Sequence, residues 1–274
     1  MRGTPSYWRG WSYRDTMSRM KALDNLGIVC RLALALANAR FKQRIAGRYL
    51  GIFWYMLEPL AFFLILLFLQ ANIVANTIPQ YPAYLLLGII MLNFFVSSTT
   101  NALASMRESK NLIQSVNIRT EALPLATVIQ FCYSHMFEFA LFVVTVLIIK
   151  DFSWNVVWYL PVFFFYAIFV LGCSYILATA GVFIEDFKNV WTVLSRLIWL
   201  GTPVFYALTD RNLLYLANLF NPLYYFLLAA RDAVIYGIMP DCSLLLSLPI
   251  FSLAVLVFGL AIFERYKRRF AEFI

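Results

Sequence analysis

A cluster of basic residues directly before a long apolar run constrains this chain most strongly. The apolar run covers about residues 53–75 and opens with a Trp-Tyr pair, and the basic residues before it are Arg40, Lys42, Arg44 and Arg48. A run of about 20 apolar residues is long enough to cross a bilayer as a helix. Lys and Arg are retained on the cytoplasmic side, whereas amphipathic rings settle at headgroup level. The pattern therefore predicts the cytoplasmic entrance of a first membrane span.

The composition of the whole chain indicates an integral membrane protein. Of its 274 residues, 62% are hydrophobic and 13% are charged, and the mean hydropathy is +0.76. Soluble globular domains carry about 25% charged residues. The net charge of +8 lies mainly in segments that we place on the cytoplasmic side, where anionic lipid and orientation account for it. We therefore expect membrane lipids, and no nucleic acid, as partners of these charges.

Six apolar runs are long enough to cross a bilayer. They lie at about residues 53–75, 83–104, 123–149, 156–183, 190–209 and 243–263. The loop at 105–122 and the C-terminal tail are basic, whereas the loop at 76–82 is uncharged, which places the basic segments inside. We expect an all-α membrane domain over residues 28–274 with both termini in the cytoplasm. Residues 1–27 lack the apolar core of a signal peptide and predict a cytoplasmic extension.

Two segments do not fit a plain six-helix bundle. Residues 26–48 predict an amphipathic helix at the membrane interface, with an apolar side made of Ile28, Val29, Leu32, Ala33 and Leu36. Arg40 and Arg44 return toward that side, so we expect the last turns to leave the lipid or to meet a partner protein. Residues 221–237 are apolar but too short to cross and return. They predict a short re-entrant or surface helix, because non-helical backbone at membrane depth needs protein or water around it.

The sequence contains no recognisable catalytic or cofactor site. A phosphate-binding loop needs Gly-Lys-Ser/Thr, and none of the six lysines follows a glycine. The single histidine, His135, has no strained nucleophile turn beside it. The four cysteines are scattered singly, which indicates neither a disulfide framework nor a metal site. We expect a chain without enzymatic activity, cofactor or metal and without an ATP site of its own.

Several polar and aromatic residues fall inside the predicted spans. His135 and Glu138 lie one helical turn apart, which indicates either proton-coupled transport or a packing contact. Arg196 either faces a cavity that holds an anionic lipid headgroup, or it forms an ion pair or extends its side chain to the inner membrane surface. Aromatic rings make up 18% of the chain; most suit lipid or core, and some suit the faces of sugars. Our candidates for lining a substrate channel are Tyr55, Phe62, Phe94, Phe95, Arg196, Trp199 and Tyr206.

Short runs along the chain resemble one family of membrane proteins. The run GRYLGIFWYMLEPL at 47–60 is similar to the first-span entrance in membrane subunits of type 2 ABC exporters. Collinear similarities follow in YPAYLLLGIIMLNFF, NLIQSVNIRTEALPLATVI, EDFKNVWTVL with TPVFY, NPLYYFLLAARDAVIYG and the tail FERYKRRFAEFI. The pattern most resembles exporters of polysaccharides, with O-antigen and teichoic-acid translocators before capsule exporters. At 118–121 the family's Phe-Pro-Arg-Glu is replaced by Ile-Arg-Thr-Glu, so the loop lacks its proline.

This resemblance implies a homodimer of six-span subunits in the inner membrane, with two ATP-binding subunits on the cytoplasmic side. A lipid-linked polysaccharide would pass through a channel at the dimer interface. The expected coupling residues at the inner face are Arg40, Lys42, Arg44, Arg48, Arg107 and Lys110. The expected external gate residues are Pro222, Tyr224, Tyr225, Arg231 and Asp232, of which the last two would hydrogen-bond and hold the turn. A secondary transporter is the alternative, although the chain shows no internal repeat of the kind such transporters contain.

Overall fold

The computed structural model of this chain describes residues 13–45, 54–73, 78–115, 118–149, 154–208, 213–239 and 241–273. These residues form helices, turns and loops without a strand, which confirms the predicted all-α class. The elements are α1 (Tyr13–Ile45), α2 (Trp54–Ile73), α3 (Tyr81–Glu108), α4 (Lys110–Ser115), α5 (Ala122–Ile149), η2 (Trp154–Trp158), α6 (Tyr159–Phe183), α7 (Phe187–Gly201), α8 (Leu213–Leu219), α9 (Pro222–Arg231), η3 (Asp232–Tyr236), α10 (Cys242–Tyr266), η4 (Lys267–Arg269) and α11 (Phe270–Phe273).

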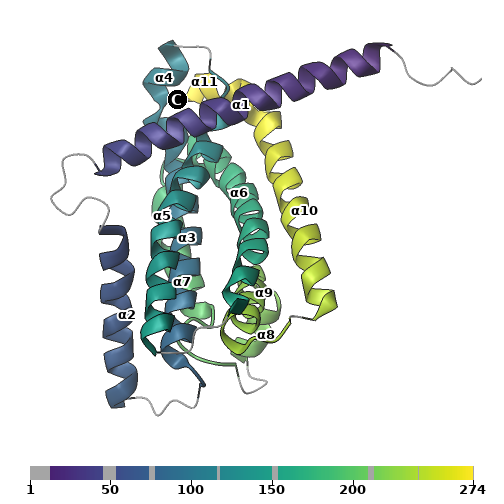
Figure 1. Cartoon of the computed structure of the whole chain (residues 1–274). Coiled ribbons are helices and arrows are strands. Elements are labelled where there is room, and N and C mark those ends of the chain that lie inside the picture. The colour runs from purple at the N-terminus through teal and green to yellow at the C-terminus, as the bar shows by residue number, and fades with distance from the viewer. Residues whose placement is uncertain are drawn as a thin grey trace, which may run out of the picture.

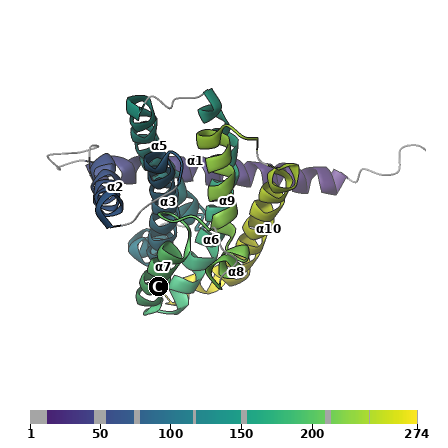
Figure 2. The same ribbon diagram turned by 90° about the horizontal axis from the view of Figure 1, so that it is seen from below.

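The long helices stand side by side, and α1 lies across one end of them (Figure 1). In the view from below, α2 and α10 lie on opposite sides of the bundle (Figure 2). We call the end formed by α1, α4, η4 and α11 the α1 end. We call the opposite end, formed by α8, α9, η3 and the segment 202–208, the α9 end.

Four helices in the described part of the chain are long and apolar enough to cross a membrane. They are Tyr81–Glu108, Ala122–Ile149, Val156–Phe183 and Cys242–Arg269, and they coincide with four of the six predicted spans. The apolar part of α2, Met56–Ala71, is shorter than a full span. The pair formed by α8 and α9 with η3 is bent by 91° and has the composition of a broken span or a re-entrant loop.

The predicted fifth span at 190–209 is wrong beyond Gly201, where the helix ends. Helix α7 has 15 residues, so it is only about 22 Å long, against a hydrocarbon core of about 30 Å. Thr202 adopts an extended conformation with φ −82° and ψ 137°. Pro203 follows it, and a residue before proline is disfavoured in the helical region. The apolar run therefore continues past Gly201 as irregular backbone.

Helix α3 is the centre of the bundle and α10 is its periphery. In the most apolar part of α3, 78% of the residues are buried, whereas in the corresponding part of α10 only 17% of the residues are buried. Helix α10 packs on α6 where Gly172 and Gly259 bring the two backbones together. A Cβ atom on Gly172 would lie 2.7 Å from the carbonyl oxygen of Val255. Glycines at this crossing permit the close backbone approach that membrane helices use in place of a hydrophobic driving force.

Helix α1 docks on α5 through four fully buried alanines, which are Ala33, Ala37, Ala122 and Ala126. Small residues four apart on both helices let the backbones approach closely. The helix begins at Tyr13 instead of 26, and Ile28 on its predicted apolar side is 44% exposed. Arg40 does return to the packed side, where it donates to the hydroxyls of Thr127 on α5 and of Ser109 directly after α3.

Candidate functional site

The irregular segment 202–208 after α7 lies at the α9 end, and its backbone carbonyls need hydrogen-bond donors. The last carbonyls of a helix have no partner within it, and irregular backbone in a membrane protein must be satisfied by protein or water. Tyr81 donates to the carbonyl of Phe205 at 3.1 Å, and Tyr84 donates to the carbonyl of Tyr206 at 2.8 Å. Two tyrosines of α3 therefore hold the far part of the segment.

Two asparagines of the α8–α9 corner hold the near part of the same segment. Asn218 donates to the carbonyl of Gly201 at 2.9 Å, and the Tyr206 hydroxyl donates to the same carbonyl at 2.7 Å. Asn221 donates to the hydroxyl of Thr202 at 2.9 Å and also accepts from the backbone N–H of Leu223 as the N-cap of α9. The corner between α8 and α9 is thereby attached to the end of α7.

Arg231 completes this network from the last turn of α9. Its side chain is 3% exposed and donates to the carbonyls of Pro203 at 2.7 Å, Val204 at 3.0 Å and Tyr84 at 3.2 Å. The guanidinium carbon lies 3.3 Å from the centre of the Tyr84 ring. Within the described residues this arginine has no carboxylate partner, so carbonyl dipoles and an aromatic face balance its buried charge. Gly88 makes room for it, since a Cβ there would lie 2.8 Å from Nη2.

Arg231 hydrogen-bonds to carbonyls of the segment 202–208 and of Tyr84 and, within the described residues, not to Asp232. Adjacent residues on a helix do not face each other. Arg231 reaches inward to the segment 202–208, whereas Asp232 remains half-buried at the start of η3. The turn into α9 is held instead by Asn221 and by Pro222 at the first helical position.

The other predicted gate residues lie on the first turns of α9. Tyr224 and Tyr225 are half-buried, and their ring centres are 5.4 Å apart. The Tyr225 hydroxyl donates to the carbonyl of Leu219 at 2.9 Å across the α8–α9 corner. Pro222 and Tyr225 also line an apolar cavity of about 290 Å³ against α10.

A groove of about 650 Å³ lies between α2 and α7 and contains two of the predicted channel residues. Its lining consists of Leu57, Glu58, Ala61, Phe62, Ile65, Asn93 and Trp199. The rings of Phe62 and Trp199 meet edge to face, with centres 4.9 Å apart at 81°. The groove therefore combines two aromatic rings with one carboxylate and one amide.

Four other predicted channel residues do not line the groove; they are Phe94, Phe95, Arg196 and Tyr206. Phe94 and Phe95 are 2% and 4% exposed and pack within the core, the first against Phe163 and the second against Phe169. Their rings belong to the packing between α3 and α6 and not to the groove. Arg196 is exposed on α7. The Tyr206 ring meets Phe205 edge to face, with ring centres 5.1 Å apart, and Phe205 in turn stacks on Trp199 of the groove. The side chain of Tyr55 lies outside the described residues.

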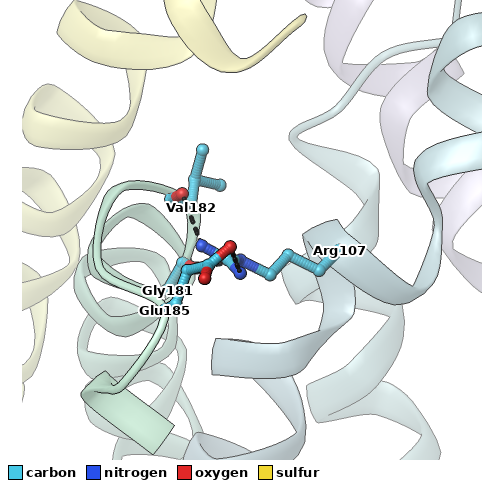
Figure 3. A network of polar contacts seen from close by, with 4 residues as sticks. All are labelled: Arg107, Gly181, Val182 and Glu185. Carbon is cyan, nitrogen blue, oxygen red and sulfur yellow. Dashed lines mark hydrogen bonds and ion pairs between the residues drawn. The ribbon is translucent and has the colours of Figure 1, made fainter. Parts of the chain in front are cut away.

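At the α1 end, Arg107 joins the ends of α3 and α6 (Figure 3). It donates to the carbonyls of Gly181 at 2.8 Å and Val182 at 3.1 Å, and it pairs with Glu185 at 3.0 Å. The first two carbonyls belong to the last turn of α6, where a cation is favoured by the helix dipole. Arg107, which the sequence predicted as a coupling residue, thus caps a helix of its own chain.

Arg40 has a similar joining position between α1, α3 and α5. It donates to the hydroxyls of Thr127 and Ser109, each at 3.0 Å. Burial lowers the pKa of its guanidinium from the ordinary value, and the Glu108 carboxylate opposes that shift. Lys42 and Lys110 are exposed, whereas Arg44 stacks over Phe131 at 5.2 Å. Arg48 lies outside the described residues.

A further ion pair at this end connects the start of α5 to η4. Lys267 pairs with both Glu121 and Glu264. Burial raises the pKa of Glu121, but the hydrogen bond from Lys267 and its positive charge more than offset this effect. The pKa of Glu121 is therefore lower than its ordinary value.

Sequence reasoning missed the residues that support the segment 202–208. They are Tyr81, Tyr84, Asn218 and Asn221. The dipeptides Thr-Pro at 202–203 and Asn-Pro at 221–222 are the available signal, since each marks a helix break whose backbone groups need side-chain partners. The identity of those partners depends on helices that are far apart in the sequence.

Comparisons with known proteins show which sequences this chain resembles. The family model of the ABC-2 type transporter matches residues 31–235. The O-antigen export system permease protein RfbA of Klebsiella pneumoniae is 28% identical over 93% of this chain and 99% of its own length. The protein of the same name from Myxococcus xanthus is 26% identical over 89% of this chain and 95% of its own length. The polysialic acid transport protein KpsM of Escherichia coli is 24% identical over 83% and 92%, respectively.

The matched range extends from α1 to η3 and contains both the α2–α7 groove and the complete Arg231 network. It covers well over half of the sequence, and the relatives align along nearly their full lengths. This chain therefore belongs to the ABC-2 type transporter family.

Proposed function

We propose that this chain is the permease subunit of an ATP-driven exporter that moves a lipid-linked polysaccharide, specifically O-antigen, across the inner membrane. The observation that carries the proposal is the match to the ABC-2 family together with O-antigen export permeases aligned over nearly the whole chain. A capsular polysaccharide is the second candidate, favoured by the similarity to the polysialic acid transport protein. Teichoic acid is the third candidate for the exported polymer.

The chemistry of the α2–α7 groove supports a carbohydrate substrate. The apolar faces of sugar rings stack on aromatic side chains, and their hydroxyls bond to carboxylates and amides. Trp199 and Phe62 supply the rings, while Glu58 and Asn93 supply the polar partners. Arg196 and Tyr206 lie on or just beyond α7 and would extend this surface along the polymer. We assign substrate contact to the groove for these reasons.

A second copy of the chain completes the channel in this proposal. Helices α2 and α7 carry large exposed apolar side chains, among them Ile65 on α2 and Val193, Leu197 and Leu200 on α7. With the apolar segments adjoining α2 and α7, the subunit would cross the membrane six times. Pairing of these two helices across a two-fold axis would enclose the groove, and the α8–α9 corner with Tyr224 and Tyr225 would form its outer gate.

The ATP-binding subunits dock at the α1 end, on the cytoplasmic side together with both termini. The basic residues Lys42 and Lys110 are suited to contact a partner because both are exposed at this end. Arg40 and Arg107 act behind them by holding α1, α3, α5 and α6 together. The force of ATP hydrolysis would reach the groove through these helices.

Polysaccharide export in cells that carry variants of the groove tests this function. Trp199→Ala removes one stacking ring and is expected to reduce export several-fold at normal membrane levels. Phe164→Ala is the matched control, because Phe164 is an exposed ring on α6 outside the groove. Equal export by the two variants would contradict the assignment of the groove. A second assay measures ATP hydrolysis, which the purified chain should lack and which should appear only with an ATP-binding subunit.

A further inference from the structure

A small polar cavity lies inside the bundle between α1, α2, α3 and α5. It has a volume of about 50 Å³. Its lining is mostly polar and consists of Arg44, Glu58, Asn93, Phe94, Ser97, Phe131, Ser134 and Glu138. It shares Glu58 and Asn93 with the α2–α7 groove. It also shares Arg44 with a polar cavity of about 440 Å³ at the α1 end.

One carboxylate in this cavity lacks a sufficient partner. The Oε2 atom of Glu138 is buried without a hydrogen bond in the described part of the chain. It lies 3.5 Å from Nδ1 of His135, a separation too long for a good hydrogen bond. The other ring nitrogen of His135, Nε2, is 2.7 Å from the hydroxyl of Tyr159. Tyr159 therefore orients the His135 ring through Nε2, whereas Nδ1 of His135 and Oε2 of Glu138 have no hydrogen bond among the described residues.

The remaining polar walls offer further hydrogen-bonding capacity. The hydroxyl of Ser134 donates to the carbonyl of Gln130 at 3.4 Å, which leaves its oxygen able to accept. Asn93 and Ser97 stand one helical turn apart on α3 and present an amide and a hydroxyl to the same space. A buried polar group without a partner costs roughly 1 to 3 kcal/mol, and Oε2 of Glu138 is such a group in the described part of the chain.

We propose that this cavity is a water-binding site in which a small cluster of ordered waters links Glu138 to Glu58 and Arg44. Each buried water needs about 10 to 15 Å³ and two to four polar partners, so the cavity can hold about three. A metal cation fits less well, because the positively charged Arg44 lines the same space as the two carboxylates. The proposal does not depend on the exported substrate.

Such a water cluster would connect α1 and α2 to the centre of the bundle by exchangeable hydrogen bonds. Glu58 lies on α2 and Arg44 near the end of α1, whereas Glu138 belongs to α5. Water-mediated bonds are nearly as favourable as direct ones and tolerate small displacements of their partners. Helix α2 would then shift beside the groove without breaking a direct ion pair.

Radiolytic hydroxyl-radical footprinting of the full-length protein in lipid nanodiscs tests the proposal, because radicals formed from bound water modify the aromatic rings that they touch. Phe131 lines the cavity and is 5% exposed, whereas Phe142 lies on the same helix and is 0% exposed outside the cavity. We expect Phe131 to be modified several-fold faster than Phe142. Equal rates would overturn the proposal.

A variant that excludes water from the cavity distinguishes radicals formed from bound water from radicals formed in bulk solvent. Ser97→Val replaces the hydroxyl by two methyl groups on Cβ, which removes a hydrogen-bonding group from the wall and fills part of the cavity, and it should lower the modification of Phe131 to the level of Phe142. Unchanged modification would mean that the radicals come from outside and would also overturn the proposal. If Ser97→Val does not insert into the membrane, Ser134→Val makes the same change from α5.

Discussion

The two ends of the molecule use arginine in opposite ways. At the α1 end, Arg107 pairs with Glu185, and their side chains are 34% and 84% exposed. At the α9 end, Arg231 is almost completely buried, and its hydrogen-bond partners among the described residues are carbonyl groups, with the ring of Tyr84 beneath its guanidinium. An exposed ion pair contributes about 0 to 1 kcal/mol, whereas a buried charge without its partners is severely destabilising. The exposed Arg107–Glu185 pair therefore contributes little by itself to stability, whereas the buried charge of Arg231 is essential to the α9 end.

Arg231→Met is expected to have the largest effect, because it leaves the carbonyls of Pro203, Val204 and Tyr84 without their donor. The free energy of unfolding should fall by about 3 to 5 kcal/mol. Thermal unfolding of the purified protein in detergent measures this change. Arg196→Met is the matched control, since Arg196 is exposed on α7, and it should unfold like the parent. Similar losses in both variants would remove the contrast between buried and exposed arginine.

Arg107→Met should have an intermediate effect at the opposite end. The last turn of α6 loses two side-chain donors and a favourable cation, which lowers the free energy of unfolding by about 1 to 2 kcal/mol. The same unfolding measurement applies. Lys110→Met removes a neighbouring exposed charge and serves as its control. A loss as large as that of Arg231→Met would show that the α1 end is as rigidly specified as the α9 end.

Tyr84→Phe should separate the two roles of this residue. The ring remains under Arg231 while the hydroxyl bond to the carbonyl of Tyr206 is lost, so the free energy of unfolding should fall by about 1 kcal/mol. Tyr84→Leu also removes the ring face and should cost up to about 2 kcal/mol more. Equal unfolding temperatures for the two variants would mean that the ring does not stabilise the buried charge.

Acid should weaken the α1 end through Glu121, whose stabilising effect should disappear when the carboxylate is protonated. The pKa of Glu121 is lowered in the folded state, so its stabilising contribution is complete above the ordinary carboxyl value of about 4.3. That contribution is lost as the pH falls through the lowered value. Glu121→Gln should cost about 1 kcal/mol at neutral pH, and the difference from the parent should vanish in strong acid. Unfolding curves recorded across this pH range measure it; a difference that does not depend on pH would exclude the ion pair as its cause.

Much of the helical framework could be predicted because hydropathy and length are local properties. The predicted runs at 83–104, 123–149, 156–183 and 243–263 coincide with long apolar helices. The fifth run failed because Thr202 and Pro203 end α7 without lowering the apolar character of the sequence. For the site, aromatic content indicated candidate rings, yet it did not distinguish Trp199 in the groove from Phe95 in the core.

The sequence by itself determined that this chain enters a membrane, where its long helices lie and that it has a family resemblance to exporters. These properties follow from sums over neighbouring residues, such as apolar length and the placement of Lys and Arg. Only the tertiary structure decided that Arg231 serves the carbonyls of Pro203 and Val204, and that Phe62 meets Trp199. The physical reason is that hydrogen bonds and ring contacts act over a few ångströms, so their partners depend on how distant helices pack.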